Sequence, residues 1–203
     1  QVHDVAIAGD VAMLAAGAGG VEVVRLYPEF ELLQRCPTDG FAVAVAAVGE
    51  LACVAEFEGG MSVWRMSPSG HLQRLGCYQP EGRIVRDVVV PAPGRYALVR
   101  LDMSILDIVD LSNPANPARV YRDKRGGFLY HVADELLDGE SAVALWQLGG
   151  LWAYNLYGSE PLSEPFPIYT ERIGMAGAAL VDDCIVVPNA GRLHLFRRDD
   201  ARW

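Results

Sequence analysis

Three aspartates are the residues of this sequence best suited to acid–base chemistry. Asp4, Asp87 and Asp134 each lie near the start of a predicted strand, and two carboxyl groups at a defined separation are what glycoside hydrolysis requires. Basic and aromatic side chains stand beside them, so the candidate ligand-binding set is His3, Asp4, Arg86, Asp87, Tyr130, His131 and Asp134. The alternative is that an Asp before Val accepts backbone N–H groups at a strand start. No glutamate is aligned with them as a general acid, which favours this structural alternative.

Other catalytic and metal-binding patterns are missing from the sequence. His3, Asp4, Asp87 and His131 are residue types that bind divalent ions, but they lack the spacing of a local ligand set. There is no C-x-x-C pair, no G-x-S-x-G motif, no cysteine beside a histidine and no G-x-G-x-x-G that opens a helix. We therefore assign no catalytic residue, no metal and no cofactor.

The charge balance argues against nucleic acid and anionic membranes as partners. The 203 residues include 17 basic and 26 acidic side chains, for a net charge of −9. Lys124 is the single lysine, and no run of Lys and Arg exceeds two residues. A nucleic-acid-binding protein needs a basic face that displaces counterions from phosphates. No apolar stretch approaches the ~18 residues of a spanning helix, so we expect no transmembrane segment.

The elements that must position the candidate side chains are repeated strands. A pattern of apolar–x–apolar–apolar–polar–apolar residues follows a small-residue turn five times, starting at residues 21, 61, 106, 151 and 193, and the last copy ends in Arg198 instead of an apolar residue. Two strand patterns precede each copy, with turns such as Gly9-Asp10 and Gly49-Glu50 between them, and a fourth strand follows. The first strand of each unit is predicted at residues 4–7, 42–45, 87–90, 131–137 and 175–180.

A unit of four short antiparallel strands cannot bury its own face, whereas five such units arranged radially can. A repeat of about 40–45 residues with four strands is typical of a β-propeller, and a β-sandwich does not predict self-similar units. We therefore predict an all-β fold, a propeller of about five four-stranded blades, the last with three or four strands. It forms a single domain over 1–203, either complete or cut from a longer protein, with repeats at approximately 2–40, 41–83, 84–127, 128–171 and 172–203.

One repeat resembles a known family. The strand Leu106-Asp107-Ile108-Val109-Asp110 and the following Asn113-Pro114-Ala115-Asn116-Pro117 resemble the LVIVD repeat, in which such a strand precedes an Asp-Pro-x-x-Pro segment. Asp107 departs from that pattern, while Asp4-Val5-Ala6 and Asp87-Val88-Val89 match the family's first strand. The resemblance implies a bacterial or archaeal propeller, often exported or at the cell surface. It transfers no catalytic residues.

Two functions are compatible with this architecture. The favoured hypothesis is a non-enzymatic binding or scaffold module for a protein or a carbohydrate, with its ligand at the channel mouth where the first strands begin. The alternative is a glycan-processing hydrolase, which requires that Asp4, Asp87 and Asp134 converge within ~5–10 Å. Trp64 and Trp152 are predicted to pack between blades rather than to bind sugar. The proline-rich stretch 157–169 is an outer connection or a loop for a partner.

The end of the chain raises the question of how the propeller closes. We expect a closed monomer in which Leu195 packs against residues 5–7, and in which the charged residues 197–200 blunt the exposed edge of the last blade. The cysteines show no spacing of a disulfide framework: Cys36, Cys53, Cys77 and Cys184. A cytoplasmic location is therefore allowed beside the exported one that the resemblance implies.

Overall fold

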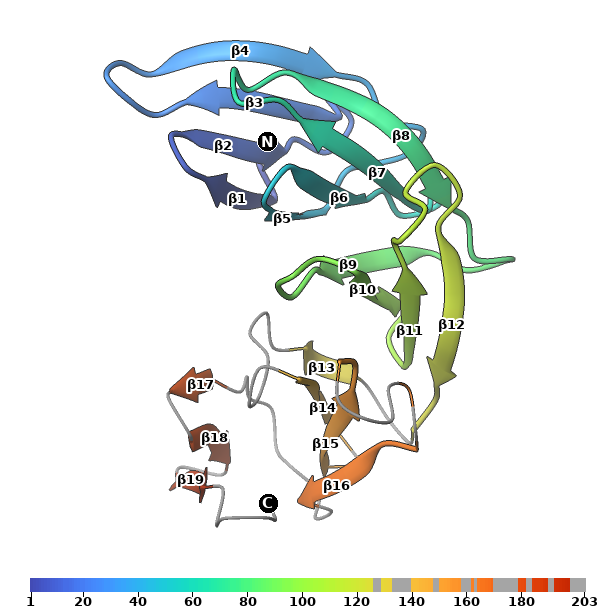
Figure 1. Ribbon diagram of the computed structural model, residues 1–203. Coiled ribbons are helices and arrows are strands. Elements are labelled where there is room, and N and C mark those ends of the chain that lie inside the picture. Colours follow the sequence, from blue (N-terminus) through green and yellow to red (C-terminus); the bar gives the residue numbers. More distant parts are fainter. Residues whose placement is uncertain are drawn as a thin grey trace. The chain divides into compact units, whose positions relative to one another are not determined.

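Figure 1 shows the computed structural model of the chain, which describes residues 1–125, 129–132, 140–147, 150–157, 162, 164–169, 179–181, 184–189 and 192–197. Within these ranges the chain forms nineteen β-strands and no helix. The strands make five antiparallel sheets, each built from consecutive strands. There are two compact units, Gln1–Asp102 with Asp107–Arg122, and Met103–Leu106 with Asp123–Trp203.

The first two sheets begin the chain and have the same strand order (Figure 1). They consist of β1 (Asp4–Ala8), β2 (Val11–Ala15), β3 (Val21–Arg25) and β4 (Glu31–Cys36), and of β5 (Ala44–Val48), β6 (Leu51–Ala55), β7 (Met61–Met66) and β8 (Leu72–Tyr78). Gly9-Asp10 and Gly49-Glu50 are the two-residue turns between their first and second strands. Gly9 and Gly49 have φ values of 61° and 58°, which glycine adopts without strain. These turns confirm the hairpins predicted from the sequence.

The remaining sheets repeat this arrangement. The third has β9 (Val85–Val89), β10 (Tyr96–Leu101), β11 (Ile105–Asp110) and β12 (Ala118–Asp123); the fourth has β13 (Leu129–Val132), β14 (Ser141–Trp146), β15 (Gly150–Asn155) and β16 (Phe166–Tyr169); the fifth has β17 (Ala179–Val181), β18 (Cys184–Asn189) and β19 (Arg192–Arg197). In the part of the chain that the structure describes, the fifth sheet therefore has three strands.

Alternate residues of neighbouring strands bury the sheet faces against one another. Within the first unit, one cluster of buried side chains joins the first and second sheets: Val11, Met13, Ala15, Val21, Val23, Cys36, Ala42, Val45, Ala52, Val54, Trp64, Met66 and Leu72. Within the second unit, a cluster joins the fourth and fifth sheets: Val143, Leu145, Leu151, Ala153, Ile185 and Val187. Burial of this apolar surface is what a single four-stranded sheet cannot achieve alone.

A buried carboxylate ties the second sheet to the third. Asp107 of β11 is 0% exposed, and it accepts a hydrogen bond from the Tyr78 hydroxyl at 2.5 Å. The Arg122 guanidinium donates to the same carboxylate from Nε at 2.6 Å and from Nη2 at 2.7 Å. Burial, together with the bond to Asp107, raises the pKa of Tyr78 to about 12. Asp107 is the one residue at which this strand departs from the LVIVD pattern, and the bidentate pair with Arg122 satisfies its buried carboxylate.

A second buried carboxylate, that of Asp123, binds a side chain of the fourth sheet. Asp123 accepts hydrogen bonds from the Tyr154 hydroxyl at 2.7 Å and from Arg125 Nε at 2.8 Å. The Arg125 guanidinium also lies over the Trp152 ring, 3.4 Å from its centroid. Trp64 of the second sheet is 5% exposed and belongs to the buried cluster that joins the first and second sheets. This is the packing between blades that the sequence analysis favoured.

Several strand boundaries differ from the sequence prediction. β5 begins at Ala44 rather than at residue 42, because Ala42 forms an isolated bridge with Gly17. β9 begins at Val85, two residues earlier than predicted, and β16 occupies the end of the stretch 157–169 that was expected to be irregular. The predicted strand residues 133–137 and 175–178, and the tail 198–203, lie outside the described residues. The expected contact of Leu195 with residues 5–7 joins residues of different units, so it stays a prediction.

Candidate functional site

The predicted mouth residues of the first unit lie where the first strands begin. His3 directly precedes β1 and Asp4 opens it, while Arg86 and Asp87 are the second and third residues of β9. Tyr130 and His131 belong to β13, but their side chains are not described, and Asp134 lies outside the described residues. Whether all seven residues share a site is therefore a prediction.

The two described aspartates are engaged in structural bonds. Asp4 accepts the backbone N–H of Val5 at 2.9 Å and, through its other oxygen, the N–H of Val45 in β5 at 2.9 Å. Asp87 accepts the N–H of Val88 at 3.0 Å and pairs with Arg100, also at 3.0 Å. These are the bonds of a carboxylate that fixes a strand start, which matches the structural alternative better than the hydrolase.

Aromatic and cationic side chains form a continuous row along the same strand starts. The rings of His3 and Phe41 meet edge to face, with centroids 5.0 Å apart. Phe41 stacks on Phe57 at 5.8 Å with an interplanar angle of 19°, and the Arg86 guanidinium lies over the Phe57 ring at 5.4 Å. We call His3, Phe41, Phe57 and Arg86 the mouth row. Such contacts are favourable beyond the burial of surface.

Backbone bridges between successive sheets bring these residues together. The β2–β3 turn bonds to the next sheet through Gly17 and Ala42, at 3.0 and 3.1 Å. The β6–β7 turn does the same through Phe57 and Val85, at 3.1 and 2.9 Å. Phe57 occupies the place in its turn that Gly17 occupies in the earlier one, with a φ of 47°. This backbone conformation is uncommon for a bulky residue, and the bridge holds it there.

A buried glutamate holds the two phenylalanine-bearing loops. Glu56 is 0% exposed; one of its oxygens accepts the backbone N–H of Asp39 at 2.9 Å, and the other accepts the hydroxyl of Ser62. The Ser62 oxygen in turn accepts the indole N–H of Trp64 at 2.6 Å. Glu56 thus connects the loop before Phe41 to the turn that carries Phe57, and it positions the mouth row without belonging to it.

This buried position gives Glu56 a distinctive effect on stability. Burial raises the pKa of its carboxyl group above the ordinary value, although the bonds from Ser62 and Asp39 act in the opposite direction. A raised folded-state pKa means that the group's contribution is fully present below the unfolded pKa of about 4.3, and is lost as the pH rises through the folded pKa.

We therefore expect the stability advantage of the wild type over Glu56→Gln to be largest near the acid end and to shrink as the pH rises. Urea unfolding of both proteins at a series of pH values measures this difference, because the amide does not titrate. A difference that is constant with pH, or that grows as the pH rises, contradicts the assignment.

Arg86 is the chemically unsatisfied member of the mouth row. Its Nε is buried, and it has no hydrogen-bond partner among the described residues. A buried donor without an acceptor costs free energy. Phe41 is 37% exposed, so the row presents an apolar ring and an unpaired cation together.

A pocket of about 420 Å³ opens at one end of the row. His3 and Phe41 line it with the Gly17–Gly19 turn and Glu22. A Cβ atom on Gly17 would stand 2.7 Å from the Phe41 ring and 3.1 Å from His3 Nε2. The glycine therefore allows the two rings to approach the turn closely.

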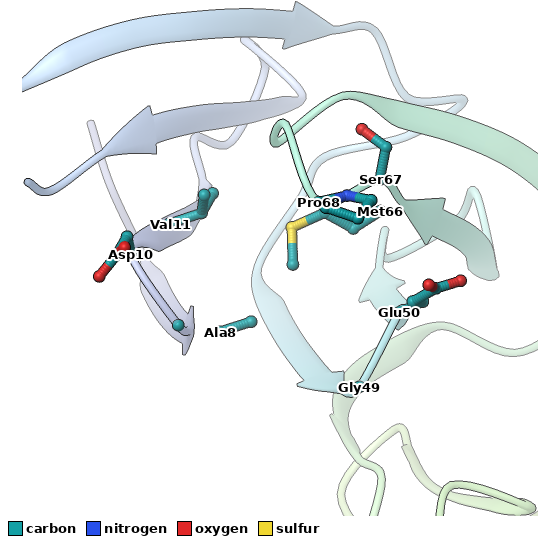
Figure 2. Close-up of a pocket in the computed structure, with 9 residues that line it drawn as sticks. Ala8, Asp10, Val11, Gly49, Glu50, Met66, Ser67 and Pro68 are labelled. Atoms are coloured by element: carbon teal, nitrogen blue, oxygen red, sulfur yellow. The ribbon is translucent and has the colours of Figure 1, made fainter.

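A second pocket lies at the other end of β1 and β5, and Figure 2 shows its lining. Its volume is about 390 Å³, and the hairpin turns at Gly9-Asp10 and Gly49-Glu50 surround it with Met66, Ser67 and Pro68. The two carboxylates of this lining, Asp10 and Glu50, belong to the exposed hairpin turns. Among the residues that the structure describes, no group of three or more His, Cys, Asp or Glu side chains could hold a metal ion.

Solved structures match this arrangement of sheets at low sequence identity. A protein from Lactobacillus plantarum superimposes with a TM-score of 0.71 and 14% identity over 98% of this chain, and the β-propeller domain of Cps50 (Swd1) from Myceliophteria thermophila does so with 0.68 and 10% over 99%. AztD from Citrobacter koseri matches with 0.64 and 12% over 91% of the chain. The chain covers 67%, 71% and 53% of these three proteins, respectively. No protein-family model matches the sequence, and no curated protein matches it.

The fold is that of a β-propeller. The likeness confirms the predicted fold class, and each described sheet is a blade of this fold. The propeller's described residues include no helix of the length and hydropathy needed to cross a membrane.

The sequence did not single out Phe41, Phe57 or Glu56. A usable signal exists for Phe57, because it replaces a glycine of the preceding repeat, four residues before the recurring strand. No comparable signal exists for Phe41, which lies in an irregular segment between β4 and β5.

Proposed function

We propose that this propeller is a non-enzymatic binding module whose mouth row binds a segment of a protein partner. The supporting observation is the row itself, in which an exposed phenylalanine lies two ring contacts from an arginine with a buried, unpaired Nε. An apolar side chain of the partner would pack on Phe41, and a carbonyl or carboxylate oxygen would accept from Arg86. Aromatic and arginine side chains are those that most often dominate binding energy.

A carbohydrate fits the same row less well. A sugar stacks on an open aromatic face, and the Phe57 ring is already engaged by Phe41 and Arg86. The engaged carboxylates of Asp4 and Asp87 also give little support to a glycan hydrolase.

We also propose that the protein is a divergent relative of the LVIVD-repeat propellers, which would imply a bacterial or archaeal origin and an exported or surface location. Asp107 interrupts the motif, and its bonds to Tyr78 and Arg122 supply a structural reason for the change. Relatives with an apolar residue at position 107 should also carry apolar residues at positions 78 and 122. Sequences in which these three positions vary independently would contradict this relationship.

The binding proposal predicts that peptides selected against this protein depend on the mouth row. Peptides enriched from a random library should contain an apolar and an acidic residue. Phe41→Ala and Arg86→Gln should each weaken their binding about tenfold, a loss of about 1.4 kcal/mol. Titration calorimetry measures the affinities, and thermal melting verifies that both variants are folded.

Two exposed residues outside the row provide matched controls. Phe30, which is 82% exposed, and Arg65, which is also exposed, should tolerate Phe30→Ala and Arg65→Gln without loss of peptide binding. Enriched peptides that bind both row variants as well as the wild type would contradict the proposal, as would a glycan array that yields ligands when the peptide library yields none.

A further inference from the structure

A second concentration of arginines lies in the first unit and shares no residue with the mouth row. Three of the chain's arginines line one pocket of about 440 Å³: Arg83, Arg119 and Arg122. The rest of its lining comes from the end of β8 and the loop after it, at Tyr78, Gln79, Pro80 and Glu81. Because the chain carries a net charge of −9, the pocket differs in character from the surface as a whole.

Carboxylates anchor two of these arginines without consuming all their donors. Arg122 uses Nε and Nη2 on Asp107, and Arg83 uses Nη1 on Asp102 at 2.8 Å. A guanidinium has five N–H donors, so each arginine keeps others for a ligand. Their side chains are 30% and 34% exposed, which leaves them accessible while their ion pairs limit their movement.

Arg119 differs from the other two because it is uncommitted. It is exposed on β12, and among the described residues its side chain makes no hydrogen bond or ion pair, although its charge acts on the nearby Tyr78. Its full charge is therefore available to a bound group. A planar guanidinium matches the two oxygens of a carboxylate or a phosphate.

We propose that this pocket binds an oxyanion, the carboxylate or phosphate group of a small ligand. Arg83 and Arg122 supply donors that are already positioned, and Arg119 supplies the unpaired charge. Glu81, the exposed acidic residue of the lining, opposes an anion and weakens the site. We therefore expect opposite changes in anion affinity when Arg119 and Glu81 are neutralised.

Titration with three probes at constant ionic strength tests this proposal: inorganic phosphate, sulfate and citrate, each against chloride. Amide NMR shifts should saturate around residues 78–83 and 119–122. Arg119→Gln should weaken the binding about tenfold, whereas Glu81→Gln should strengthen it. Arg65→Gln removes the same charge elsewhere on the first unit and should leave the affinity unchanged.

The probes also distinguish the source of the oxyanion. Tighter binding of phosphate and sulfate than of citrate indicates a phosphate-type ligand, and the reverse order indicates a carboxylate. The proposal is overturned if no probe gives saturable shifts, if Arg119→Gln binds as the wild type does, or if Arg65→Gln weakens binding equally. Failure of the mouth-row experiment does not affect this result, because the two sites have no residue in common.

Discussion

Asp107→Ala should lower the free energy of unfolding by about 3 kcal/mol, the largest loss that we expect from removing a single side chain of the hydrogen-bond network of Tyr78, Asp107 and Arg122. The substitution leaves the Arg122 guanidinium and the Tyr78 hydroxyl without the acceptor that both now share. Breaking a buried ion pair in this way costs about 3–5 kcal/mol. We expect the lower end of that range because Arg122 is 30% exposed, so water can solvate it in part. For a chain of this size the loss corresponds to about 6–12 °C in Tm.

Two comparisons show whether stranded partners cause the loss at Asp107. Glu31→Ala breaks the exposed pair with Arg25, whose side chains are 39% and 58% exposed, and should cost at most about 1 kcal/mol. The triple variant Tyr78→Phe, Asp107→Leu, Arg122→Met removes every partner at once and should recover most of the lost stability, since apolar replacement of a buried network is often neutral. If the triple variant does not recover stability, stranded partners are not the cause of the loss. An equal loss from Glu31→Ala would show that burial of the Asp107 pair adds nothing beyond an exposed pair.

The strands were predictable because their signals are local. The alternation of residues such as those of Val21–Arg25 and the turn at Gly9-Asp10 are properties of a few adjacent residues. The five repeats then follow from comparing these short patterns. The boundary of β5 was missed because Ala42 pairs with Gly17, a partner 25 positions earlier that no local pattern indicates.

The candidate site was less predictable, because its members meet only in three dimensions. His3 and Arg86 were selected for their chemical type and for their place at strand starts. Phe41 and Phe57 were not, since bridges between sheets bring them into contact. The partners of Asp107 illustrate the same limit: Tyr78 lies 29 residues away from it, and nothing in either local sequence connects them.

Gly20→Ala should be the most disruptive glycine substitution in the β2–β3 turn, with a loss of about 3–4 kcal/mol. Gly20 has a φ of 77°, a left-handed conformation that costs an L-residue about 1–2 kcal/mol. Its Cβ would also stand 2.2 Å from the backbone oxygen of Cys36, which cannot move without disturbing the pairing of β3 with β4. Overpacking of this kind adds about 1–3 kcal/mol.

Comparison with Gly9→Ala separates the cost of the left-handed conformation from the cost of the close contact. The same comparison tests whether the β2–β3 turn supports the mouth row. Gly9 has a φ of 61° but no atom within 4 Å of its missing Cβ, so its substitution carries the conformational cost alone, about 1–2 kcal/mol. Urea unfolding of both variants should show the additional loss for Gly20→Ala. Because Gly20 bonds to Gly17, which lies against the Phe41 and His3 rings, Gly20→Ala should also weaken peptide binding at the mouth row, whereas Gly9→Ala should not. Equal losses of stability in the two variants would show that the close contact with Cys36 relaxes at no cost.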